Sequence, residues 1–432
     1  MLALKVVGMR HVHEFRDPIH TAISVTADEL KVIDSQFFQR LRHIHQLALT
    51  YLVFPGATHK RFEHSIGVME LASRIFDVVT DDANLVDENV RKIIPDRGSK
   101  QYWKSLLRTA ALCHDLGHLP FSHAAEELLP DGYDHEQLTR DIIHSSSMRK
   151  IWSAMTPPLL ADDIVRLAIG EKAVGAREQT TWEAILAQII SGEAFGADRM
   201  DYLLRDSYHL GVQFGFFDCH RLIKSLRILP VEHGGADQLA LGVEASALET
   251  SEKLMVARES MFKDVYFHPT RRIYDIHLRD FLKTWLPGGR FSTNLRMHLQ
   301  TSDLEILSAM RRADSNRKSP RHDLARRIQR REHFLLFCES YLNGTGDALA
   351  NAAEKQFGAD AIRYDRVPAA VQVPEFPIWH RNGKIESSLR LSRVPPRAPE
   401  ISIGRIYCKA SMHPAIIRWR YLRSIAASGD SP

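Results

Sequence analysis

The chain has few cysteines, no long apolar run and little excess of either charge. Its four cysteines (Cys113, Cys219, Cys338 and Cys408) lack CxxC spacing, so neither a disulfide framework nor a thiolate zinc site is indicated. No stretch is apolar enough to span a bilayer, and the N-terminal apolar run is too short for a signal peptide. We therefore expect a cytoplasmic protein without membrane contact. The net charge of +4 does not by itself indicate nucleic-acid binding.

The composition that remains is that of an ordinary globular protein, with 44% hydrophobic and 25% charged residues. Apolar residues recur at helical spacing over 62–79, 104–117, 161–170, 181–192, 198–210, 246–266 and 270–285. The segments LRILPVE and QLALGVE, joined by HGGAD, predict one β-hairpin. VQVPEFPIW and ISIGRIYC resemble strands. The sequence thus predicts a mainly α fold with a small β-hairpin and a mixed α/β C-terminal region.

Four short segments combine residues that bind divalent metals. They are RFEHSIGV with His64, LCHDLGHLPFSH with the pair His114-Asp115, DHEQ with His135, and GADRMDYLLRD with Asp198. Imidazole and carboxylate groups of this kind can hold one ion that activates water near neutral pH. A His-Asp pair alone occurs by chance, whereas the ordered set is specific.

These segments resemble the HD-domain phosphohydrolases, and most closely the catalytic domain of the sterile-alpha-motif/HD-type dNTP triphosphohydrolases. The resemblance begins at FRDPIH, continues through FFQRLRHIHQL, and extends to about Leu229, with a further match at VYFHPTRR. It implies an HD-domain helical bundle. With the breaks at WLPGGRF and VPPRAPE, we expect an HD catalytic core over 1–290, a helical basic segment over 291–366 and a small mixed region over 367–432. The sterile-alpha-motif part has no counterpart in this sequence.

The resemblance also implies roles for individual residues. The metal ligands would be His64, His114, Asp115 and Asp198, holding one divalent ion (Mn, Fe, Mg, Zn or Co). The catalytic residues would be His118, His123, His135 and Glu126. Among these, His123 resembles the general acid, with His118 as the alternative.

Helical periodicity supports part of this assignment. His114 and His118 are four residues apart, so one helical turn would place both rings in the same space. The alternative is a histidine-rich helix end that interacts with the helix dipole. In the segment after Asp198, the residues Tyr202, Arg205, Asp206 and His209 fall on one stripe. A solvated helix face is the simpler interpretation of that stripe, although Lys and Glu would then be expected.

By the same resemblance, seven residues would contact substrate: Gln46, Leu47, Arg61, Arg199, Tyr202, Asp206 and Tyr266. Arg61 and Arg199 would bind phosphate, and Asp206 would bind the 3′-hydroxyl. Gln46 and Leu47 would line the deoxyribose pocket and exclude a 2′-hydroxyl. Phe267 departs from the family, which has a glutamine there, so base preference is open.

A second set matches residues that bind an activating guanine nucleotide in the family: Asp34, Gln39, Arg42 and Arg221. His13 replaces a lysine of that site, and helix–helix salt bridges are the alternative. A homo-oligomer, dimer or tetramer, is expected if the site is real. The basic run 311–331 is interpreted as an exposed helix or loop, with a nucleic-acid arm as the weaker alternative.

The function expected from the resemblance is metal-dependent conversion of a dNTP and water to deoxynucleoside and triphosphate, with dNTPs as substrates. Two alternatives remain open at this stage. One is an HD-type phosphodiesterase, nuclease or nucleotidase with the same metal site. The other is a non-catalytic nucleotide sensor. The physiological role, such as dNTP homeostasis or defence against phage, is not determined by the sequence.

Overall fold

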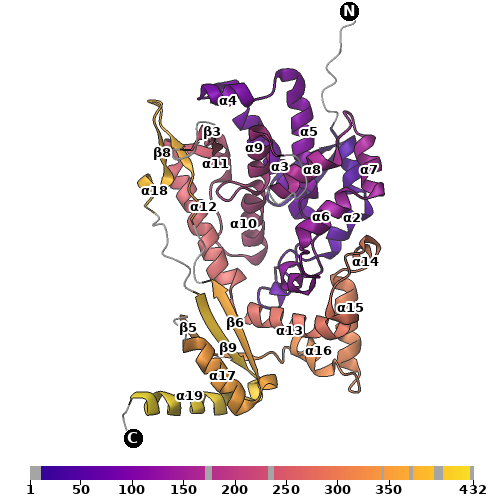
Figure 1. Ribbon diagram of the computed structural model, residues 1–432, viewed down its shortest axis with the longest axis vertical. Helices are drawn as coiled ribbons and strands as arrows, with labels where there is room; N and C mark the ends of the chain where they lie inside the picture. Colours follow the sequence, from indigo (N-terminus) through magenta and orange to yellow (C-terminus); the bar gives the residue numbers. More distant parts are fainter. Residues whose placement is uncertain are drawn as a thin grey trace, which may run out of the picture.

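The computed structural model describes residues 11–170, 178–231, 238–341, 345–368, 373–393 and 402–428, and the fold is mainly α (Figure 1). The helices are α1 Ala27–Ile33, α2 Gln36–Arg40, α3 Arg61–Val79, α4 Glu88–Ile93, α5 Arg97–Cys113, α6 His135–Ile143, α7 Ser146–Ser153, α8 Ala161–Ile169, α9 Thr181–Ser191, α10 Ala197–Leu210, α11 Cys219–Ser225, α12 Leu248–Met261, α13 Pro269–Trp285, α14 Leu295–Leu299, α15 Asp303–Ser315, α16 His322–Gln329, α17 Thr345–Phe357, α18 Ser388–Leu391 and α19 His413–Ser428. None of the described helices is long and apolar enough to cross a membrane.

All seven predicted helical segments are helical, but the segment 104–117 is wrong at both ends. Helix α5 begins earlier, at Arg97, where the Asp96 side chain caps it by accepting from the Ser99 amide. It ends at Cys113, with His114 as the C-cap. The chain then turns tightly, because Gly117 packs against the backbone of α6, where a Cβ atom would lie 2.0 Å from the His135 carbonyl oxygen. His114 and His118 are therefore not on one helix.

The strands form three small sheets. β1 His11–Asp17 pairs with β2 Thr21–Thr26. The predicted hairpin is confirmed as β3 Leu226–Pro230 and β4 Leu239–Glu244, although its connecting glycines lie outside the described residues. β7 Pro377–Trp379 and β8 Ile385–Ser387 extend this hairpin in the order β3-β4-β7-β8.

The third sheet has the order β5-β9-β6, formed by β5 Leu335–Tyr341, β6 Ile362–Pro368 and β9 Ser402–Cys408. Of the segment ISIGRIYC, residues 402–408 are thus confirmed as a strand. Sheet pairing links the predicted ranges 1–290, 291–366 and 367–432 to one another, since β4 pairs with β7 and β9 pairs with β5 and β6. The division of the chain into three domains remains a prediction.

Two apolar cores position the candidate site. The larger is centred on α3, which packs against α5 and α10 with Ile66, Met69 and Leu71 fully or almost fully buried. The second joins α13, α15 and α16 to the loop that carries Leu119 and Phe121. In Figure 1, α13, α15 and α16 lie below the α3–α5–α10 bundle. The loop after α5 thus bridges both cores.

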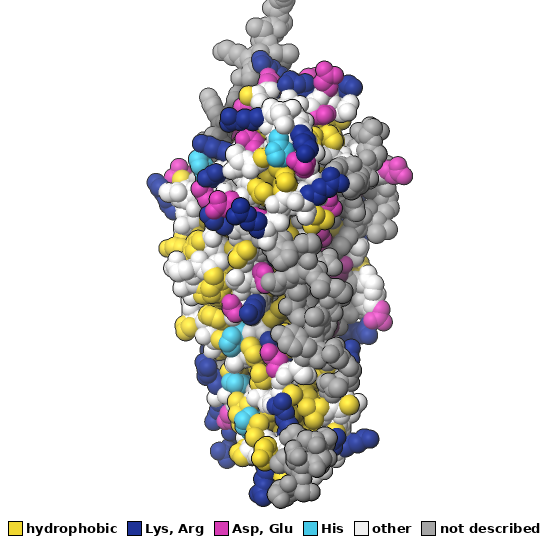
Figure 2. Space-filling model, turned by 90° about the vertical axis from the view of Figure 1, so that its left-hand side faces the viewer, with side chains coloured by type: hydrophobic (Ala, Val, Ile, Leu, Met, Phe, Trp, Pro, Cys, Tyr) yellow, Lys and Arg dark blue, Asp and Glu magenta, His cyan; other side chains and the backbone are white. Residues whose placement is uncertain are grey.

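The surface carries mixed charges. On the face seen in Figure 2, Lys and Arg side chains are interspersed with Asp and Glu side chains. The basic run 311–331 covers the end of α15 and all of α16, and two of its arginines, Arg326 and Arg330, form ion pairs with Glu332 and Asp314. This agrees with the interpretation of the run as an exposed helix and loop.

Candidate metal centre and active-site cavity

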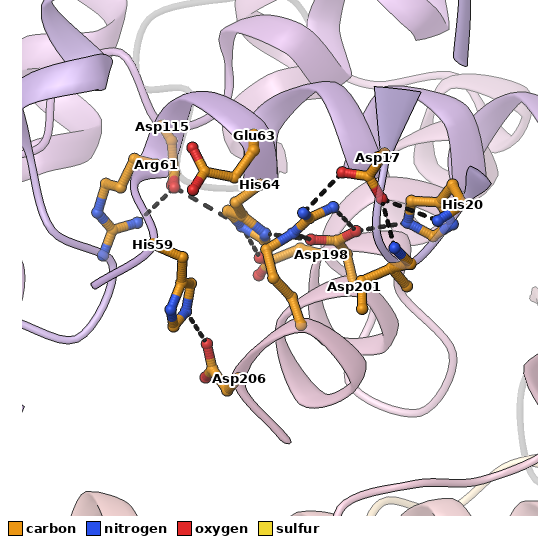
Figure 3. A network of polar contacts seen from close by, with 12 residues as sticks. Asp17, His20, His59, Arg61, Glu63, His64, Asp115, Asp198, Asp201 and Asp206 are labelled. Atoms are coloured by element: carbon orange, nitrogen blue, oxygen red, sulfur yellow. Dashed lines mark hydrogen bonds and ion pairs between the residues drawn. The ribbon is translucent and has the colours of Figure 1, made fainter. Parts of the chain in front are cut away.

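Three helices bring one carboxylate and two imidazoles together, and Figure 3 labels two of these residues, His64 and Asp198. His64 is on α3, His114 caps α5, and Asp198 is at the start of α10. Asp198 Oδ1 lies 3.0 Å from His64 Nε2 and 3.6 Å from His114 Nε2. One ligand atom from each of the three residues lies within 4.8 Å of the others. This spacing suits a single divalent ion bound by nitrogen and oxygen ligands.

Both imidazoles direct Nε2 toward the point between the three ligand atoms, which we call the metal point. His114 Nδ1 lies 2.7 Å from the Ala111 carbonyl oxygen and donates to it, while its buried Nε2 has no hydrogen-bond partner. His64 Nδ1 lies 2.8 Å from Asp201 Oδ2. In both rings, a fixed proton on Nδ1 leaves the Nε2 lone pair for a metal, which is the usual arrangement of histidine ligands. The donor set therefore fits a divalent cation.

The fourth predicted ligand, Asp115, adjoins the same point. Its Oδ1 lies 3.3 Å from His114 Nε2, and its Oδ2 lies 3.7 Å from His64 Nε2. Asp115 Oδ2 also accepts a short hydrogen bond from the Arg61 guanidinium. Burial raises the pKa of the Asp115 carboxyl, but Arg61 and the neighbouring histidines outweigh burial and hold this pKa well below its usual range. Asp115 is thus a carboxylate shared between the metal point and Arg61.

A buried polar network behind the site was missed by the sequence reasoning. Asp201 is fully buried and bonds His64, His20 Nε2 at 2.6 Å, and Arg205 at 2.8 and 2.9 Å. Arg205 in turn donates to Asp17 at 2.8 Å. Figure 3 shows this network continuing from the metal residues to the β1–β2 segment. The signal was present as Asp and His in FRDPIH, but only the fold brings that segment to α10.

A cavity of about 540 Å³ opens at the metal point. Most of the predicted site residues line it: Gln46, Leu47, Arg61, His114, Asp115, His118, His135, Asp198, Tyr202, Asp206 and Tyr266. His64, Glu126 and Arg199 are not among the lining residues. His64 lies behind the wall, 1% exposed. The side chain of His123, predicted as the general acid, lies outside the described residues.

The predicted catalytic histidines His118 and His135 lie side by side in this cavity. Their rings stack with centroids 4.1 Å apart at an interplanar angle of 17°. His135 Nδ1 makes a short hydrogen bond with Glu126, and His118 Nε2 lies 3.2 Å from Asp115 Oδ1. Burial, reinforced by the Arg61 charge, holds the pKa of His118 well below its usual range. The structure thus brings Glu126 to His135.

The opposite wall is built on α10 and on a π-helical turn, Phe262–Tyr266, that extends α12. Asp206 Oδ1 lies 2.7 Å from His59 Nε2, and its Oδ2 accepts from the Tyr266 hydroxyl at 2.6 Å. Tyr202 lies beside Tyr266, with ring centroids 6.2 Å apart. The solvated-face interpretation of α10 is wrong here, because Arg205 and Asp206 are 0% and 1% exposed. His59 had no signal of its own beyond its proximity to the RFEH motif.

The remaining predicted residues lie outside the cavity. The Nε and Nη1 atoms of Arg199 are buried and have no hydrogen-bond partner. Of the residues predicted for an activating nucleotide, Arg42 Nε donates to Gln39 Oε1 at 2.9 Å, and Arg221 Nη2 donates to the Ser246 carbonyl oxygen at 3.0 Å. Asp34 is an exposed C-cap of α1. Within the described residues, no hydrogen bond or ion pair joins Arg221 to the other three.

Comparisons with known proteins agree with this geometry. Residues 61–206 match the HD domain, and residues 217–358 match the HD associated region. An uncharacterised protein of Methanocaldococcus jannaschii is 37% identical over 264 residues, which are 61% of this chain and 48% of that protein. The deoxynucleoside triphosphate triphosphohydrolase SAMHD1 of Gallus gallus is 34% identical over 50% of this chain and 36% of its own length. The match thus spans about half or less of these relatives.

A solved structure matches nearly the whole chain. The crystal structure of a hypothetical protein from Aquifex aeolicus has a TM-score of 0.77 and 32% identity, covering 94% of this chain and 99% of that one. The HD match begins at Arg61 and ends at Asp206, so it contains every residue of the metal cluster and both stacked histidines. The chain is therefore a member of the HD-domain family, with an HD domain followed by an HD-associated region.

Proposed function

We propose that this protein is a metal-dependent dNTP triphosphohydrolase, which converts a dNTP and water to a deoxynucleoside and triphosphate. One observation carries the proposal. The cluster of His64, His114 and Asp198 borders the same cavity as the wall formed by Tyr202 and Asp206. A phosphate-activating centre and a polar wall suited to a sugar thus share one space. The likeness to SAMHD1 enzymes of several vertebrates supports this substrate class.

The metal residues would be His64, His114, Asp115 and Asp198. A divalent ion held there would supply a nucleophilic water near neutral pH and positive charge for the phosphate oxygens. Arg61 would add a permanent charge and a planar donor fork for phosphate. It lies at the cavity wall and already contacts Asp115 and Ser122 Oγ, so its guanidinium is held in place before substrate binds. On the family resemblance alone, we also propose Arg199, which follows Asp198 but does not line the cavity, as a further phosphate contact.

Departure of triphosphate requires a proton at the bridging oxygen. We propose that His118, His123, His135 and Glu126 provide it, with His123 as the donor and His118 as the alternative. The contact of Glu126 with His135 Nδ1 fixes the tautomer of that ring, so that its Nε2 can face a phosphate. The stacking of His135 on His118 holds the two rings in nearly parallel planes, with their centroids 4.1 Å apart.

Sugar selection would depend on Asp206, Tyr202, Gln46 and Leu47. Asp206 is held by His59 and Tyr266, so its carboxylate is preorganised to accept a hydrogen bond from a 3′-hydroxyl. Leu47 is buried at the cavity wall, where its apolar surface would disfavour a 2′-hydroxyl. Tyr266 would stack on the substrate beside Phe267.

We also propose that guanine nucleotides activate the enzyme and that activation accompanies homo-oligomer formation. The paired side chains of Gln39 and Arg42, with the exposed carboxylate of Asp34 on the same segment, support a polar nucleotide contact there. Light scattering with and without GTP or dGTP, run alongside hydrolysis of a second dNTP, tests this part. Unchanged mass and unchanged rate would contradict it.

Product analysis tests the reaction itself. Purified protein is incubated with each dNTP in turn and with Mn, Mg, Fe, Co or Zn, and products are separated by anion-exchange chromatography. Deoxynucleoside with intact triphosphate is expected. Deoxynucleoside monophosphate with pyrophosphate would contradict the reaction type, and phosphate release from monophosphates would favour a nucleotidase. Binding of dNTP without turnover in any metal would favour a nucleotide sensor.

A further inference from the structure

The loop after α5 contains two consecutive residues in an unfavourable backbone conformation. Phe121 and Ser122 have φ angles of 58° and 55°, which lie in the left-handed region that glycine favours. Both residues are buried, at 0% and 3% exposure, and both line the cavity. Such a turn persists only where the surrounding contacts hold it.

The turn matters because Ser122 contacts the active site directly. Its Oγ accepts from Arg61 Nε at 2.8 Å and donates to the His45 carbonyl oxygen at 3.2 Å. Arg61 in turn bonds Asp115. A shift of the turn would therefore move the guanidinium that faces both the metal point and the phosphate site.

The contact that holds the turn comes from outside the HD domain. Asp303, the first residue of α15 in the HD-associated region, is fully buried. Its Oδ1 accepts from the Phe121 amide at 2.8 Å. Its Oδ2 accepts from the His45 amide at 2.8 Å and lies 2.6 Å from His45 Nδ1. The Asp303 carboxylate thus fixes the backbone at Phe121 and at His45, and the Ser122 hydroxyl bonds the carbonyl oxygen of the same His45.

Thr301, two residues before Asp303, supports the same loop through Arg40. The carbonyl oxygen of Thr301 accepts from Arg40 Nε and Nη2 at 3.0 and 2.8 Å. The same guanidinium donates through Nη1 to the His118 carbonyl oxygen at 2.8 Å. Residues 301–303 therefore hold both ends of the loop from His118 to Ser122.

We propose that Asp303 is a positioning residue of the active site, which holds the Phe121–Ser122 turn and through it the Arg61 guanidinium. The HD-associated region would thus complete the catalytic geometry of the HD domain. The catalytic part of this role rests on the proposed function, whereas the support of the turn does not. None of the predicted metal ligands contacts Asp303, so loss of its charge should leave metal binding intact.

The test uses the full chain and the Asp303→Asn variant. The new amide keeps the shape of the carboxylate, but it replaces one of the two acceptor oxygens by an NH2 donor, so either the Phe121 or the His45 amide loses its acceptor. Hydrogen exchange read by mass spectrometry should be about tenfold faster in the peptide 118–125, as expected for one lost buried hydrogen bond. The kcat for dNTP should fall about 10- to 100-fold, as small displacements of catalytic groups cause, with KM and metal content near wild type.

Glu305→Gln is the matched control, since it removes one charge from the same turn of α15. Glu305 caps that helix through Ser302 and does not contact the loop. Exchange in 118–125 and kcat should stay near wild type. Equal effects of the two substitutions would overturn the proposal, because they would indicate a general weakening of α15.

The outcomes test the support of the turn and the proposed function separately. Unchanged exchange in 118–125 of Asp303→Asn overturns the support of the turn, and faster exchange with unchanged kcat overturns the catalytic role. Absence of dNTP hydrolysis by wild type overturns the proposed function, while the exchange measurement still tests the turn. If Asp303→Asn fails to fold, Arg40→Lys replaces it. This variant keeps one donor for Thr301 or His118, and should give a smaller change in the same direction.

Discussion

His64 Nδ1 lies 2.8 Å from Asp201 Oδ2, at the back of a ring whose Nε2 faces Asp198. Burial opposes a proton on this imidazole, but the hydrogen bonds to Asp198 and Asp201 outweigh burial and raise the pKa of His64 to about 10. Asp198 and Asp201 favour a protonated His64 ring, and their negative charges also favour a metal cation beside that ring. Asp201 therefore sets both the tautomer of the ligand and the charge of its surroundings.

Asp201→Asn should weaken metal binding by about 10- to 100-fold, the usual effect of losing the partner of a histidine ligand. Metal titration followed by elemental analysis measures this directly. The variant should also lower the melting temperature, because buried Arg205 keeps only Asp17 as a charged partner. Asp162→Asn, on an exposed side chain of α8, serves as the control. Wild-type metal affinity in Asp201→Asn would contradict the assigned role.

Asp115→Ala should strip the metal, with affinity lowered at least about 100-fold, and abolish hydrolysis while helix content stays the same. The carboxylate lies between the two histidines and Arg61, so its loss removes a ligand and frees the guanidinium. Elemental analysis and circular dichroism check the two parts. The matched control is Asp131→Ala, which removes an exposed carboxylate paired with Arg290. Full metal content in Asp115→Ala would show that this residue is not a ligand.

Gly67→Ala should destabilise the protein by about 1–3 kcal/mol, because overpacking of a filled interior is costly. A Cβ at this position would lie 2.0 Å from Asp201 Oδ1 and 2.4 Å from Arg205 Nη2. Chemical denaturation measures the change, and metal affinity should fall with it. Gly98→Ala, near the exposed start of α5, should instead be neutral or stabilising by up to about 1 kcal/mol. Equal stability of the two variants would contradict the close packing at Gly67.

A substrate without a 3′-hydroxyl should be hydrolysed more slowly. Leaving the Asp206 carboxylate without that donor costs about 1–3 kcal/mol, or roughly 5- to 150-fold in kcat/KM. Comparison of a dNTP with its 2′,3′-dideoxy analogue measures the difference, and Asp206→Asn should reduce it. Ribonucleotides should also be poor substrates, because of the apolar wall at Leu47. Equal rates for all three nucleotides would rule out sugar selection by these residues.

Stability should fall in mild acid through His209. Burial, reinforced by electrostatic interactions with His59 and Arg205, lowers the pKa of His209 from 6.5 to about 4. Below about pH 6.5 the unfolded state binds a proton that the folded state does not, so the free energy of unfolding decreases as pH falls from 6.5 towards 4. His209→Gln should make the melting temperature less dependent on pH in this window. His220→Gln, which removes an exposed histidine, should leave the pH dependence of the melting temperature unchanged.

Helical periodicity was sufficient to predict the mainly α fold, and the turn residues between two apolar runs predicted the β3–β4 hairpin. These two features are local, because apolar spacing fixes which face of α3 or α10 is buried. The approach of His64, His114 and Asp198 was implied by the resemblance of four motifs to the HD-domain family. The end of α5 was not predicted, since the apolar pattern continues past Cys113. The turn there depends on Gly117 packing against α6, a contact with another part of the chain.

Only the tertiary structure determined the residues that support the site. Asp201 meets His20 across 181 positions of sequence, and Asp303 meets Phe121 across 182. A periodic pattern carries no information on such pairs, because any buried Asp on a helix could face any basic group or backbone amide. The sequence by itself determined which metal-binding and titratable groups the chain offers for chemistry. The long-range contacts decided which rings, charges and backbone turns are held in place for it, since burial lets a single carboxylate orient several groups at once.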